Sequence, residues 1–122
     1  MQSILINSRK ADIIFRRSGR INISARVAKS LGLACGDVID IMEDHGEYYL
    51  YIKHHAPVVG RHEGMVMRSN KSGNHFIAHS VTLSRYILSK CNLYNSARLC
   101  CGEALTLPNH GIALPIITKL LL

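Results

Sequence analysis

The chain has 122 residues, of which 48% are hydrophobic and 19% are charged, and it contains no tryptophan. This length suits a single domain, and the apolar content excludes a disordered chain. Fifteen Lys and Arg against eight Asp and Glu give a net charge of +7, which favours a polyanionic partner.

No segment has the roughly 18 apolar residues that a membrane-spanning helix needs. The most apolar stretch, Ile112 to Leu122, is interrupted by Pro115 and Lys119. The N-terminus lacks the basic start and the small-residue cleavage site that are typical of a secretory signal. We therefore expect a cytoplasmic protein with no membrane association.

The first quarter of the chain predicts a β-hairpin followed by a short helix. Strands are expected over Asp12–Arg17 and Arg20–Ile23, with a turn between them. The hydroxyl of Ser24 can cap the start of the helix, which should run through Leu31. Gly32 is expected to close it in the left-handed conformation.

A second hairpin should follow this helix. Gly36-Asp37 begins a strand of alternating apolar and polar residues, and the turn at Glu43–Gly46 leads into a returning strand, Glu47–Lys53. The polar, turn-forming segment His54–His62 predicts a linker.

The second half of the chain predicts a similar series of elements. Strands are expected over Met65–Met67 and His75–Ala78. Within Thr82–Ala97, apolar residues recur at helical spacing and predict a helix, or two short ones, at Leu83, Ile87, Cys91 and Tyr94. Pro115 cannot donate to a strand ladder, so the last strand should lie at an edge or contain a bulge.

The two halves resemble each other in the order of their motifs. Cys35-Gly36-Asp37 and the later His45-Gly46 correspond to Cys101-Gly102-Glu103 and His110-Gly111, and an upstream Ser-Gly occurs in both halves. We predict two tandem pseudo-repeats within one compact domain. Residues 1–56 form the first, and residues 57–122 form the linker and a divergent second unit with a longer helical insertion.

The segment Ser18-Gly19-Arg20 with its strand, the short helix ending in Leu31-Gly32-Leu33, and the Gly36-Asp37 strand resemble the AbrB/MazE/SpoVT family of swapped-hairpin proteins. The resemblance is good over Phe15–Ile52 and weak over Met65–Ile117. It implies a mainly β fold with short helices (α+β), in which two half-units interleave their hairpins into one small barrel. A half-unit alone would leave apolar strand faces uncovered.

The resemblance also implies DNA binding, because members of this family usually act as transcriptional regulators through a basic face. Arginine suits this role, since its guanidinium can bind phosphate or guanine through two hydrogen bonds. The positions in this chain that match the family's basic face, or cluster beside it, are Arg16, Arg17, Arg20, Arg26 and Lys29.

Two positions depart from the family's pattern. Ser24 stands where the family usually has proline, and Asn74 stands where the second unit should have its motif arginine. The basic face should therefore be lopsided, with DNA bound mainly through the first half-unit.

Two other functions remain as alternatives. One is a protein-interaction module, such as an antitoxin-type or assembly subunit, that binds another chain or forms a homodimer through the apolar segment Ile112–Leu122. The other is a metal-binding protein, for which the candidate ligand sets are His54, His55 and His62, or His75, His79, Cys100 and Cys101. Neither set has the paired close spacing of a zinc site, so we expect no metal and no other cofactor.

The remaining sequence features indicate binding rather than catalysis. No nucleophile elbow, phosphate-binding glycine loop or partnered acidic pair is present, so we do not expect an enzyme. The four cysteines form neither a CxxC pair nor a secreted-domain framework, and we expect them to be reduced. Cys35 and Cys101 precede corresponding glycines, which favours small, packed residues.

Overall fold

The computed structural model describes residues 11–55, 66–68 and 75–118. These ranges contain two helices and nine strands, in the order β1 (Ile13–Arg16), β2 (Arg20–Ile23), α2 (Ala25–Leu31), β3 (Val38–Asp44), β4 (Glu47–His54), β5 (Val66–Arg68), β6 (Phe76–His79), α3 (Val81–Lys90), β7 (Ser96–Cys101), β8 (Leu105–Leu107) and β9 (Gly111–Ile117). The fold is therefore mainly β with two short helices, which confirms the α+β prediction.

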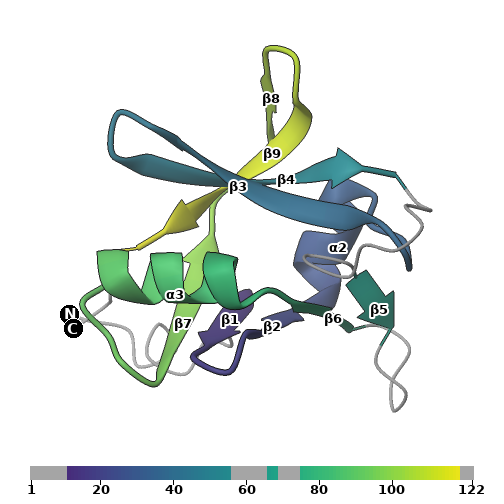
Figure 1. Cartoon of the computed structure of the whole chain (residues 1–122). Coiled ribbons are helices and arrows are strands. Elements are labelled where there is room, and N and C mark those ends of the chain that lie inside the picture. Colours follow the sequence, from purple (N-terminus) through teal and green to yellow (C-terminus); the bar gives the residue numbers. More distant parts are fainter. Residues whose placement is uncertain (1–10, 56–65, 69–74, 119–122) are drawn as a thin grey trace, which may run out of the picture.

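The strands form one curled antiparallel sheet in the order β3-β4-β9-β7-β1-β2-β6-β5, and β8 pairs with β9 beside this path. Gly36 N donates to Val66 O at 2.7 Å, and Val66 N donates to Asp37 O at 2.8 Å. These bonds join β5 to the residues just before β3. The two ends of the strand order therefore meet, and the sheet curls round on itself (Figure 1).

Strands from the two halves of the chain alternate in pairs within this sheet, β3-β4 then β9-β7, and β1-β2 then β6-β5. β2 pairs with β6, with Ile21 opposite Ala78, and β4 pairs with β9, with Leu50 opposite Leu114. Residues before and after position 56 therefore share one sheet and one core. Most of the expected linker, residues 56–62, lies outside the described residues, and His54 ends β4.

The core lies inside the curl of the sheet. Helix α3 packs on β1, β2 and β7, and helix α2 packs on β9. The largest fully buried side chains include Phe15, Ile21, Ile87, Leu99 and Leu114. Because α3 covers the inner side of β1, β2 and β7, the side chains that alternate with these core residues point to the outer side.

The first half of the chain folds as its sequence predicts. Ser24 Oγ accepts a hydrogen bond from Val27 N at 3.3 Å and caps α2. Gly32 ends the helix in the left-handed region, with φ of 70°. This conformation carries little steric cost for glycine, which explains the residue at this position.

The helix of the second half, α3, has ten residues and is longer than the seven-residue α2, as the sequence predicts. It ends at Lys90, however, before the end of the helical spacing within Thr82–Ala97. Asn92 adopts a left-handed φ of 57°, and Leu93 N donates back to Leu88 O at 2.9 Å. This closure is typical of a helix C-terminus and stops α3 there.

The residues after α3 form a strand that the sequence analysis missed. Strand β7 occupies Ser96–Cys101, and it alternates between buried residues such as Ala97 and an exposed Arg98. Tyr94 lies in the loop before β7 and is 66% exposed. The prediction that the helical segment includes Tyr94 is therefore wrong.

Pro115 lies in an interior strand. β9 pairs with β4 along one side, and along its other side it pairs first with β8 and then with β7. Pro115 O accepts a hydrogen bond from Gly102 N at 2.8 Å, so the backbone N and O of Pro115 face the point where β9 changes its partner from β8 to β7. The expected edge position is wrong, because β9 lies inside the sheet. The missing N–H falls in an irregular gap between two ladders, where the four steps from Cys101 to Leu105 lie opposite the three from Ile116 to Ala113.

Candidate nucleic-acid interface

The outer side of β7, β1, β2 and β6 brings three arginines together from three adjacent strands. Phe15 is fully buried, so its neighbour Arg16 points outward and is exposed. Arg20 on β2 and Arg98 on β7 are exposed on the same side. We call this outer surface, with Arg16, Arg20 and Arg98, the basic face.

A hollow of about 380 Å³ lies on the basic face, and all three arginines line it. Arg98, Ile14, Asn22 and Ile77 are direct neighbours in a row across the four strands, so the hollow has apolar as well as polar lining. Arg16 Nε donates a hydrogen bond to Asn22 Oδ1 at 3.3 Å, which holds the arginine over this row.

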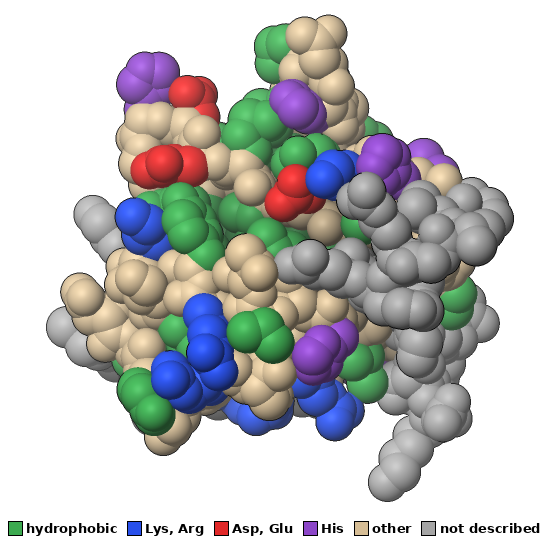
Figure 2. Space-filling model, in the orientation of Figure 1, with side chains coloured by type: hydrophobic (Ala, Val, Ile, Leu, Met, Phe, Trp, Pro, Cys, Tyr) green, Lys and Arg blue, Asp and Glu red, His purple; other side chains and the backbone are tan. Residues whose placement is uncertain are grey.

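Charge is strongly segregated along the molecule. Residues 13–36 and 64–102 contain no Asp or Glu, and they include every strand of the basic face and both helices. Five of the eight Asp and Glu residues lie on the β3–β4 hairpin and just before it, at Asp37, Asp40, Glu43, Asp44 and Glu47. Figure 2 shows most Lys and Arg low over α3 and the strands beneath it, and Asp and Glu high over β3 and β4, the strand that also carries Lys53. A polyanion is attracted to the lower end.

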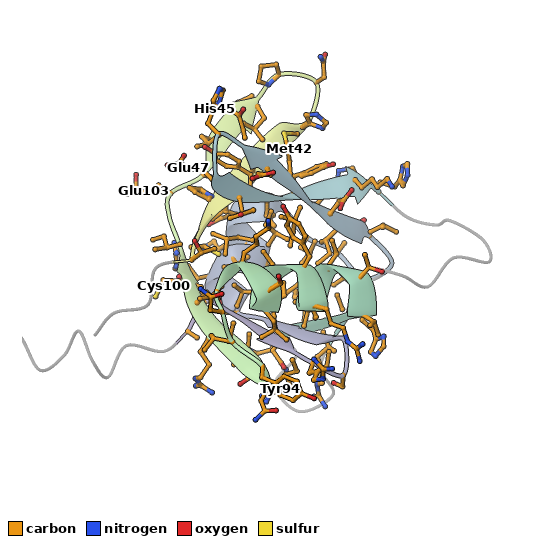
Figure 3. All side chains as sticks on the ribbon, turned by 60° about the vertical axis from the view of Figure 1, so that its left-hand side comes forward. Met42, His45, Glu47, Tyr94, Cys100 and Glu103 are labelled. Carbon is orange, nitrogen blue, oxygen red and sulfur yellow. The ribbon has the colours of Figure 1, made fainter. Side chains whose placement is uncertain are left out.

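Arg17 extends the basic end beyond β1. Its guanidinium carbon lies 4.0 Å from the centre of the Tyr94 ring. Arg85 on α3 donates from Nε to Arg17 O at 3.4 Å. Figure 3 places Tyr94 at the end of the molecule opposite His45 and Glu47 of the acidic hairpin.

Arg26 differs from Arg16 and Arg17 because its guanidinium forms an ion pair with a carboxylate of this chain. Its Nε and Nη2 donate to the two carboxylate oxygens of Asp12 at 3.1 and 2.9 Å, and Nη2 also donates to Cys101 O at 2.7 Å. The hydrogen bond to Asp12 raises the pKa of the Arg26 guanidinium, against the opposing effect of burial. Arg26 therefore has a structural partner in this chain, and its membership of the DNA-binding set stays a prediction.

Lys29 is exposed on α2 and lines a separate hollow of about 290 Å³. None of the three arginines of the basic face lines that hollow. The structure thus brings Arg16, Arg17 and Arg20 together at one end and does not place Lys29 among them.

Arg98 is a candidate that the sequence analysis missed. It lies in β7, which begins at the end of the segment Thr82–Ala97 with helical spacing and for which the sequence analysis predicts no strand. The alternation of Ala97, Leu99 and Cys101 with Arg98 and Cys100 was the signal that could have revealed the strand and its outward arginine.

No group of three or more His, Cys, Asp or Glu in the described part of the chain has a metal-binding arrangement. His75 precedes β6 and His79 ends it, whereas Cys100 and Cys101 lie on β7; His62 falls outside the described residues. Cys101 is 3% exposed, as a packed residue should be, but Cys35 is exposed. The expectation that both are packed is therefore wrong for Cys35, which lies in the loop between α2 and β3.

The apolar segment Ile112–Leu122 is largely committed to the sheet. Its described part belongs mainly to β9, where Ala113, Leu114 and Ile116 are buried in the core. Core burial accounts for the apolar character of these three side chains, whereas Ile112 and Ile117 of the same strand are 49% and 46% exposed. Within the described ranges, neither helix is long and apolar enough to cross a membrane.

Comparison of this chain with known protein families, curated proteins and solved structures finds no match. Its function is therefore inferred from the charge and geometry of the basic face.

Proposed function

We propose that this protein binds duplex DNA through the basic face and acts as a transcriptional regulator. The observation that carries the proposal is the convergence of Arg16, Arg20 and Arg98, from three adjacent strands, around one hollow. The strands of the basic face and helix α3 carry no Asp or Glu, and the carboxylate that lines the hollow, Asp12, is paired with Arg26, so little opposes the attraction of a phosphate backbone.

The shape of the face fits this role. The β1–β2 hairpin is flanked by β7 and β6, so its outer side is part of a four-stranded surface that can lie across a phosphate backbone. Arginines on this surface can bind phosphates, and a guanidinium that reaches a guanine edge can discriminate base pairs by about 1–3 kcal/mol.

We further propose that the chain is a relative of the AbrB/MazE/SpoVT swapped-hairpin proteins with both half-units in one molecule. Corresponding strands pair antiparallel with each other, β2 with β6 and β4 with β9, as two interleaved half-units would require. The series of two strands, a helix and a later hairpin also occurs in both halves.

The pairing of β2 with β6 also supports binding mainly through the first half of the chain. Arg20 on β2 lies opposite His79 on β6, so the second half presents a histidine beside the arginine of the first. We therefore expect the first half to make most phosphate contacts, with Arg98 as an additional contact from the second.

Fluorescence anisotropy with labelled duplexes of mixed sequence tests the proposal at about 50 and about 200 mM salt. We expect binding that weakens steeply with salt and is weaker for Arg20→Ala at both concentrations. The matched control is Lys90→Ala, a lost positive charge at the end of α3 beside the Tyr86 ring, which should bind nearly as wild type. Failure of the wild-type protein to bind any duplex at low salt would overturn the proposal and favour a protein partner.

A further inference from the structure

Tyr94 is an aromatic side chain that the core does not use. It is 66% exposed, more than any of the other large hydrophobic side chains that are exposed in the described ranges. It lies two residues before Ser96, the β7 partner of Arg16, so the ring stands directly beyond the end of the basic face.

The ring is held in place by the loops on both sides of it. Arg17 N donates to Asn95 O at 2.9 Å, and Arg85 Nε donates to Arg17 O at 3.4 Å, so the turn after β1, the loop before β7 and helix α3 are tied together. The guanidinium of Arg17 lies over one face of the Tyr94 ring at 4.0 Å. Because Arg17 covers only one face, the ring keeps surface that a second planar group can reach.

This combination fits a nucleobase. Unpaired bases stack on exposed aromatic rings and on arginine planes, and basic side chains beside the ring hold the backbone that carries the base. A paired base inside a duplex has both faces covered by its neighbours, so it cannot use such a ring. The fitting ligand is therefore a base at a single-stranded end or gap.

We propose that Arg17 and Tyr94 form a stacking site for an unpaired nucleobase at the end of the basic face. The protein then prefers duplex DNA that continues into a single strand, with the duplex on the basic face and the first unpaired base on the ring. This inference rests on the proposed DNA binding and adds the form of DNA that is preferred.

The test compares a blunt duplex with the same duplex carrying a short single-stranded extension, whose first base is a fluorescent adenine analogue. We expect the wild-type protein to bind the extended duplex roughly fivefold or more tightly than the blunt one, which is the lower end of the effect of one stacked base. The analogue should lose fluorescence on binding, because stacking quenches it.

Two variants separate stacking from a role in loop structure. Tyr94→Phe keeps the ring and should keep both the preference and the quenching. Tyr94→Leu should lose both while binding the blunt duplex as wild type does. Tyr49→Leu, the same change on the acidic hairpin, is the matched control and should behave as wild type.

Equal wild-type affinity for the blunt and extended duplexes overturns the stacking site but leaves the proposed duplex binding intact. Retention of the preference by Tyr94→Leu overturns it as well. A protein that binds neither form of DNA contradicts the proposed function itself, so the two failures are distinguishable.

Discussion

Asp12 and Arg26 form a two-point ion pair that ties together three distant parts of the chain. The carboxylate receives Arg26 Nε and Nη2 at 3.1 and 2.9 Å, and Asp12 Oδ2 also accepts the backbone N–H of Cys101 at 2.8 Å. Asp12 is 5% exposed, so its charge depends on these donors rather than on water. The pair joins the start of β1, helix α2 and the end of β7.

Replacement of Arg26 by alanine should destabilise the protein by about 2–4 kcal/mol, because it leaves the buried carboxylate without its charged partner. Urea unfolding at neutral pH measures the change. Lys29→Ala, an exposed change on the same helix, should alter stability by less than about 0.5 kcal/mol. Equal stability of the two variants would contradict the structural role of the pair.

Gly19 should be intolerant of any side chain, which explains the glycine before Arg20. Its φ is 103°, and an added Cβ would lie 2.9 Å from both His79 Cε1 and Val81 Cγ2. We expect Gly19→Ala to cost about 1–3 kcal/mol through strain and overlap. In Gly32→Ala the left-handed φ is strained, but the added Cβ meets no other atom. Thermal unfolding should therefore show a smaller loss of stability for Gly32→Ala than for Gly19→Ala.

The elements of the first half were predictable because local signals and the tertiary fold agree there. The cap at Ser24, the left-handed Gly32 and the apolar alternation of β3 and β4 all act within a few residues. The end of α3 was not predictable in this way. Apolar residues at helical spacing continue to Tyr94, and only the left-handed turn at Asn92 shows that the pattern stops being helical.

Part of the candidate site was predictable, because local strand patterns place two of its arginines. Arg16 and Arg20 lie in a hairpin with clear strand patterns, so their common outward side follows from alternation. The pairing of β1 with β7, which adds Arg98, is a contact between residues more than eighty positions apart. Nothing in the local sequence reveals this pairing, nor the ion pair of Arg26 with Asp12.

Stability should fall above pH 9 because of Cys101. Burial, with a smaller contribution from Asp12, raises the pKa of this thiol from 9.0 to about 12. Between these values the unfolded chain loses the proton and the folded chain keeps it, so ionisation favours unfolding as pH rises. The loss can reach about 4 kcal/mol near pH 12 and is absent below pH 9.

Cys101→Ala isolates this effect from other groups that titrate at high pH. The variant is less stable than wild type at neutral pH because of the lost packing, and the difference should shrink as pH rises toward 11 in urea unfolding. Cys35→Ala, at an exposed thiol, is the control. A difference that stays constant with pH would show that Cys101 does not titrate in this way.

The segment Met1–Ala56 should not fold alone as a monomer. Strands β1, β2 and β4 would lose their partners β7, β6 and β9, and the apolar residues on them would be uncovered. We expect the excised fragment to be unfolded, or to dimerise by pairing with a second copy of itself. Light scattering and circular dichroism distinguish these states, and a stable folded monomer would refute the tandem arrangement.

The salt dependence of DNA binding should separate the arginines of the basic face from Arg26. Each phosphate contact contributes about 0.9 to the slope of log affinity against log salt, so Arg98→Ala and Arg20→Ala should each reduce the slope by roughly that amount. Arg26→Ala should leave the slope unchanged, because its guanidinium is held by Asp12, and it should lower stability instead. Anisotropy titrations at several salt concentrations, well below the unfolding temperature of each variant, measure the slopes. A slope that falls for Arg26→Ala and stays constant for Arg98→Ala would place the DNA on α2 rather than on the outer side of β7 and β1.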